Sequence, residues 1–87
     1  MYDKLAHEMI ERECEVLGDR AIDIARDVEG IRVSDDGDVL GIDGNGADVV
    51  GDLADEYIAI LGKATEASLA AIARRYEDDV ELPGNLC

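Results

Sequence analysis

The apolar residues of the first part of the chain recur at helical spacing. Between Asp3 and Glu29 they follow one another in alternating steps of four and three residues: Ile10, Cys14, Leu17, Ala21, Ile24 and Val28. This spacing places the side chains on one face of an α-helix. Asp3 can cap its start, and Gly30 suits the position just past its end. The pattern predicts one long helix over 3–29.

The period changes to two residues over 31–43. Ile31 and Val33 alternate with polar residues, and Leu40 and Ile42 resume the alternation after a break that contains Gly37. Aspartates surround this glycine, and glycine accepts the positive φ of a tight hairpin turn. The segment therefore predicts a two-stranded antiparallel β-hairpin with its aspartates at the turn and toward solvent.

A second helical pattern covers 46–79, with Asn45 as a good N-cap. Between Tyr57 and Ala73 the only charged residues are Lys63 and Glu66, so this helix is apolar nearly all round. A helix of this kind is buried. The first helix and the hairpin are too small to cover all of its apolar surface. Either another element covers the rest, or the helix bends back on itself.

Together the elements predict an α+β fold of order α-β-β-α. It forms a single domain over 1–87 with an irregular C-terminal tail over 80–87. A second copy of the apolar helix is the simplest cover for its free side, so the pattern predicts a helix-packed homodimer. The expected interface residues are Tyr57, Leu61, Ala64, Ser68, Ala71 and Ile72. A kink at Gly62 that folds the helix back on itself is the alternative.

Acidic residues dominate the charge. The chain has 22 Asp and Glu against 8 Lys and Arg, a formal net charge of −14, and no Phe or Trp. This composition resembles that of proteins from salt-loving archaea, where salt at about 1 M shortens the Debye length to roughly 3 Å and screens self-repulsion. An ordinary acidic protein is the alternative. The only basic cluster, Arg74 and Arg75, is followed at once by three acids, so nucleic acids and anionic membranes are not expected partners.

The two cysteines, Cys14 and Cys87, form no CxxC pair and no disulfide framework. This usage is typical of a reducing compartment. The sequence has no recognisable signal peptide and no apolar run of membrane-spanning length. We therefore expect a cytoplasmic protein.

The Asp/Gly-rich loop over 35–48 is the stretch that most resembles a binding site. An EF-hand loop needs oxygen ligands at fixed positions around a glycine, and neither register of this loop supplies them all. Asp43, Asn45 and Asp48 are the first candidates for a cation. The glycines do not match a phosphate-binding loop, and the aspartates would repel a phosphate. We expect a hairpin turn and a helix start, with a small divalent-metal-binding or catalytic domain as the alternative.

Side chains suited to catalysis are few. His7 is the sole histidine, and like Cys14 it lies near the apolar seam of the first predicted helix, where packing explains both. No catalytic residue, metal or cofactor is expected.

The stretch "GIRVSDDGDVLGIDGNGADVVGDLADEYIAILG" contains a glycine, a strand, an Asp-Gly turn, a second strand and a helix. Over residues 30–73 this order is similar to that of the roadblock/dynein-light-chain family. The resemblance implies a dimer that acts as a small regulator or scaffold for GTPases. The chain equally resembles short acidic haloarchaeal proteins to which no role is assigned. We expect a non-enzymatic, homodimeric interaction or regulatory protein of a halophilic archaeon, which binds itself and an unidentified protein partner.

Overall fold

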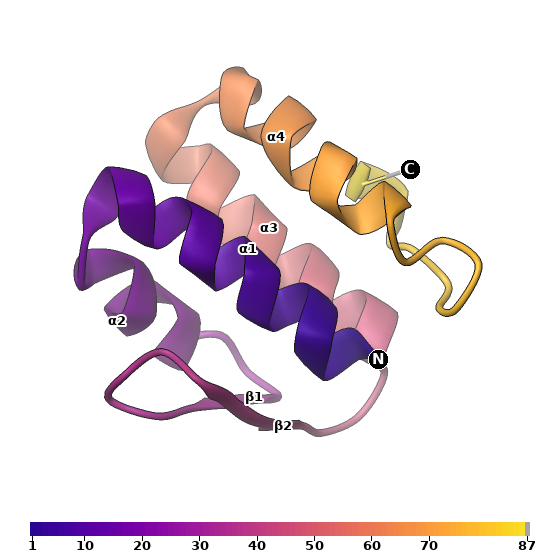
Figure 1. The fold of residues 1–87 in the computed structure, drawn as a ribbon, viewed down its shortest axis with the longest axis horizontal. Helices are drawn as coiled ribbons and strands as arrows, with labels where there is room; N and C mark the ends of the chain where they lie inside the picture. The colour runs from indigo at the N-terminus through magenta and orange to yellow at the C-terminus, as the bar shows by residue number, and fades with distance from the viewer. Residues whose placement is uncertain (87) are drawn as a thin grey trace.

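Residues 1–86 are described by the computed structural model, in which a β-hairpin separates two pairs of helices along the chain. The elements are α1 (Tyr2–Leu17), α2 (Arg20–Arg26), β1 (Ile31–Val33), β2 (Val39–Ile42), α3 (Gly46–Leu61), α4 (Lys63–Arg74) and the short 3-10 helix η1 (Gly84–Leu86). α1 and α3 lie side by side, between α4 on one side and α2 with the hairpin on the other (Figure 1). The predicted α+β class and the antiparallel hairpin are confirmed.

The first expected helix is divided at Gly18. This glycine has a φ of 63° and a ψ of −143°, a backbone conformation that residues other than glycine rarely adopt. Its amide donates a hydrogen bond of 2.9 Å to the Cys14 carbonyl and ends α1. α2 then folds back against α1 and ends at Arg26. The prediction of one helix over 3–29 is wrong, because this reversal brings the apolar face of α2 onto the core.

The second expected helix is divided at Gly62, where φ is 89° and ψ is −176°. The Gly62 amide bonds the Ile58 carbonyl at 2.7 Å, and α4 turns back against α3 and α1. α4 ends at Arg74, and hydrogen-bonded turns follow it. The prediction of an unbroken helix over 46–79 is therefore wrong, and the alternative of a fold-back at Gly62 is what the structure shows. The chain itself covers much of the apolar surface of this segment.

The hairpin contains one irregularity. β1 and β2 pair in a register that matches Ile31 with Ile42, Arg32 with Gly41 and Val33 with Val39. Leu40 is an extra residue between the last two pairs, and its side chain is 65% exposed. The turn packs on α2, since a Cβ at Gly37 would lie 3.2 Å from the side chain of Ile22.

The core draws on every helix and on β1. Its largest buried side chain is Tyr57 of α3, whose hydroxyl donates a hydrogen bond of 2.7 Å to the Ala21 carbonyl of α2. Leu86 of η1 is fully buried and ties the end of the chain to α3 and α4. The tail expected to be irregular over 80–87 therefore contains an ordered turn, and its last residue lies outside the described residues.

No helix within residues 1–86 combines the length and the apolar character needed to cross a membrane.

Candidate functional site

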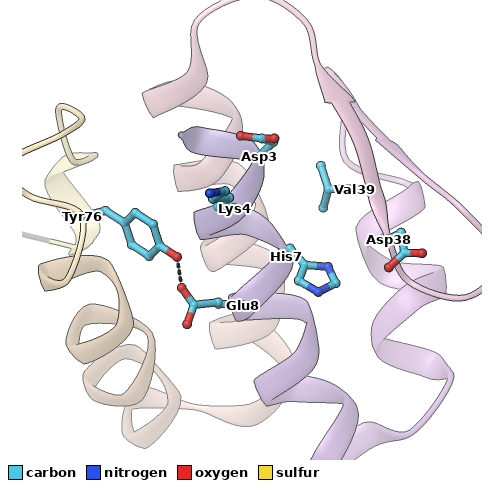
Figure 2. A pocket seen from close by; sticks show the side chains of 7 residues that line it. All are labelled: Asp3, Lys4, His7, Glu8, Asp38, Val39 and Tyr76. Atoms are coloured by element: carbon cyan, nitrogen blue, oxygen red, sulfur yellow. Dashed lines mark hydrogen bonds between the residues drawn. The ribbon is translucent and has the colours of Figure 1, made fainter.

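A pocket of about 280 Å³ opens over the outer face of α1 (Figure 2). It is lined by Asp3, Lys4, His7 and Glu8 of α1, Asp38 and Val39 of the hairpin, and Tyr76 after α4. Tyr76 is directed at Glu8, whereas His7 lies on the other side of α1, toward the hairpin. The fold thus gathers several ionisable side chains that are far apart in the sequence.

Glu8 holds the segment after α4 against α1. One carboxylate oxygen accepts a hydrogen bond from the Tyr76 hydroxyl, and the other lies 3.1 Å from Nη1 of Arg75. The Glu8 carboxylate raises the pKa of Tyr76, because the neutral hydroxyl donates this bond. Nε2 of His7 instead lies 3.6 Å from a carboxylate oxygen of Glu11. These contacts form a clasp between α1 and the C-terminal segment.

The Asp/Gly-rich loop places its candidate cation ligands in structural contacts. Asn45 caps α3 as predicted, because its Oδ1 accepts a hydrogen bond of 3.1 Å from the Asp48 amide. Asp43 lies 3.4 Å from Nε of Arg32 on β1. Within residues 1–86, no group of three or more His, Cys, Asp or Glu side chains is arranged to hold a metal ion. The contacts that the loop does make stabilise the hairpin and the start of α3.

The fold separates the six residues predicted for a dimer interface. Tyr57 and Ile72 are 0% and 7% exposed in the single chain, so they belong to its own core. The others reach the surface wholly or in part: Leu61, Ala64, Ser68 and Ala71. The fold-back at Gly62 is the reason, because it turns the larger apolar side chains of α3 and α4 inward.

The outward side of α4 forms one exposed helix face. Its members are all exposed, and from Ala64 onward they recur in steps of three and four residues: Lys63, Ala64, Ala67, Ala71 and Arg74. We call this set the α4 surface. Leu69 and Ile72 lie on the opposite, buried side of the helix. The α4 surface therefore has a small apolar middle and a basic group toward each end.

The charges of the α4 surface have no ion-pair partners within the described residues. Neither Lys63 nor Arg74 forms an ion pair within residues 1–86, although the sequence contains 22 acidic residues. Glu66, the acidic residue between them, is exposed and also unpaired within the described chain. Sequence reasoning noted Lys63 and Glu66 in this segment but named only uncharged residues for the interface. The available signal was the presence of two bases on an alanine-rich helix of a very acidic chain.

One carboxyl group lies in the core. Glu13 of α1 is 2% exposed, and its Oε2 has no hydrogen-bond partner within residues 1–86. Burial raises the pKa of Glu13, and the positive charge of Arg12 only partly opposes this. Burial likewise raises the pKa of the neighbouring Cys14 thiol, which packs against the core as expected. The helical seam read from the sequence did not include Glu13.

Comparisons of the chain with models of protein families, with curated proteins and with solved structures find no match. The resemblance of residues 30–73 to the roadblock/dynein-light-chain family therefore stays a prediction from the sequence.

Proposed function

We propose that this chain is a non-enzymatic, homodimeric interaction or regulatory protein in the cytoplasm of a halophilic archaeon, and that the α4 surface is its contact with a second copy. The observation that supports this proposal is the composition of that surface. Three exposed alanines lie between two unpaired bases, in a chain whose net charge is −14. Two such chains repel each other over most of their area, so they approach at least cost where acidic side chains are sparse.

Apolar side chains extend this contact beyond α4. Ile60, in the last turn of α3, is 45% exposed, and Leu61 beside it is half-buried. Large apolar side chains at the surface are typical of the centres of protein interfaces, and small side chains let two helices pack closely. The proposed interface is therefore the face that the fold-back at Gly62 leaves exposed. It differs from the interface expected from the sequence, which assumed an unbent helix with apolar residues on all sides.

Light scattering in concentrated KCl tests the proposal. We expect a mass of twice 9.4 kDa for the wild type. Ala67→Glu places a charge at the middle of the α4 surface and should give the monomer mass. Val16→Glu is the matched control, because Val16 of α1 is also an exposed apolar helix residue, at 56%, and that variant should stay dimeric. A wild-type mass of 9.4 kDa at every concentration would overturn the proposal.

Calorimetric titration with Ca²⁺ and Mg²⁺ distinguishes this proposal from the alternative function, metal binding or catalysis at loop 35–48. If the interaction role is correct, the titration should show no saturable micromolar binding. If such binding occurs and is lost in Asp43→Ala, the metal site replaces the interaction role as the better description. Asp23→Ala, at an exposed position of α2 outside the loop, is the control for removal of one negative charge.

A further inference from the structure

The charges along α4 and the turns after it follow a definite order. A base, Lys63, comes first, then the acid Glu66, then the bases Arg74 and Arg75, and finally three acids, Glu77, Asp78 and Asp79. All seven side chains are exposed, and apart from Arg75, which pairs with Glu8, none of them forms an ion pair within residues 1–86. The segment therefore begins with a base and ends with acids, and an acid precedes the bases in its middle.

A shallow hollow lies beside the middle of this segment. Its volume is about 220 Å³, and it is lined by Lys63, Glu66, Ala67, Ala70 and Asn85. The side chain of Asn85 is already bonded to α3, to the Gly51 carbonyl at 3.0 Å and to Asp55 at 2.8 Å. Because the Asn85 amide is bonded to α3, it does not occupy the Glu66 carboxylate, which has no ion pair within residues 1–86. A cationic side chain that enters the hollow can therefore pair with Glu66.

The signs match when two copies of α4 pair antiparallel. In a two-fold pair of antiparallel helices, residues equally far before and after the axis face one another. With the axis beside Ala70, Glu66 of one copy faces Arg74 of the other, because each lies four residues from the axis, and the small residues Ala70 and Ala71 let the helices approach closely. In a parallel pair, each of these charges would face its own kind.

We propose that two copies of this chain pair antiparallel through α4, so that Arg74 of each copy enters the hollow of the other and pairs with Glu66. The antiparallel direction also brings Lys63 of each copy toward the acidic turns after α4 of the other, which contain Glu77 and Asp78, and so offers partners to bases that have none within residues 1–86. This arrangement rests on the proposed homodimer and adds its orientation, its register and its specificity-determining charges. It also explains why so acidic a chain keeps two bases on one alanine-rich face.

Charge reversal with rescue tests the pairing. Sedimentation equilibrium is measured at about 1 M KCl, where the Debye length is about 3 Å and only charges in contact still interact. Arg74→Glu and Glu66→Arg should each raise the dimer Kd by about tenfold or more. The double variant should return the Kd to within about threefold of the wild type. Glu66 and Arg74 lie about 12 Å apart along their own helix, so the rescue must act between chains.

Arg20→Glu is the matched control, because Arg20 is an exposed base of α2 without an ion pair in the described chain. It makes the same change in net charge as Arg74→Glu and should leave the Kd unchanged. If Arg74→Glu behaves like Arg20→Glu, or if the double variant shows no rescue, the pairing is overturned while a dimer through another surface stands. If the wild type is a monomer, the homodimer and the pairing fail together.

Cross-linking provides a second readout that does not depend on the folding of charge-reversed variants. In a Cys14→Ser, Cys87→Ser background, Ala71→Cys lies beside the proposed axis and should form an intermolecular disulfide under mild oxidation. Val16→Cys, on the exposed face of α1, should not. Equal cross-linking of the two variants would also overturn the pairing.

Discussion

We predict that Glu13 lowers the stability of the fold at alkaline pH and that its replacement stabilises the protein. The side chain is 2% exposed, and Oε2 has no partner in the described chain. A buried polar group without a hydrogen bond costs about 1–3 kcal/mol, and an ionised one costs more. Glu13→Met has similar length and no polar atoms, so we expect the free energy of unfolding to rise by about 1–3 kcal/mol. In a domain of 87 residues, each kcal/mol raises Tm by roughly 4–8 °C.

The pH dependence separates the cost of the charge from that of the carboxyl group. Burial raises the pKa of Glu13 in the folded protein above its ordinary value of 4.5, so the folded state keeps its proton to higher pH than the unfolded state does. The contribution of Glu13 to wild-type stability therefore falls as pH rises from 4.5 through the raised pKa, and is constant above it. Glu13→Gln cannot ionise. The free energy of unfolding of Glu13→Gln should equal that of the wild type at acidic pH. It should exceed the wild-type value increasingly over that pH window, by up to about 1 kcal/mol.

Urea unfolding in concentrated KCl, followed by circular dichroism between about pH 4 and about pH 9, measures these differences. The surface carboxylates also titrate over this range, but they do so equally in both proteins and cancel in the difference. Glu15→Gln, at an exposed site on the same helix, is the control and should change stability by less than about 0.5 kcal/mol. A difference between wild type and Glu13→Gln that does not vary with pH would refute the reasoning, as would a less stable Glu13→Gln at alkaline pH.

Three further changes test the fold and its solvent. Tyr57→Phe removes the buried hydrogen bond to the Ala21 carbonyl and should destabilise the protein by about 1–2 kcal/mol in urea unfolding, so an unchanged midpoint would contradict that contact. Gly62→Ala forces a side chain into positive φ and should lower the free energy of unfolding by about 1–3 kcal/mol. Gly84→Ala is the control, because no atoms lie near its added Cβ, and it should melt like the wild type. Equal melting temperatures of the two variants would argue against the fold-back. Tm should fall as KCl is lowered, with unfolding or aggregation below about 0.5 M, and a Tm indifferent to salt would count against a halophilic origin.

Local patterns in the sequence determined most of the secondary structure. The alternation around the Asp-Gly turn predicted the hairpin, and Asn45 was correctly identified as the cap of α3. These features depend on residues a few positions apart, so turn and cap chemistry is enough to predict them. The acidic composition likewise follows from the sequence alone, and with it the requirement that a partner surface be sparse in acids.

Only the tertiary structure decided how the helices end and what they bury. A glycine within a helical pattern costs only about 1 kcal/mol, so the sequence could not show that Gly18 and Gly62 end helices rather than continue them. The fold-back at Gly62 prevails because it buries side chains such as Leu69 and Ile72, each worth about 1.5–3 kcal/mol. This same step moves Tyr57 inward and leaves Lys63 and Arg74 on the face that remains. The candidate interface therefore depends on contacts between distant segments, which a residue-by-residue pattern does not contain.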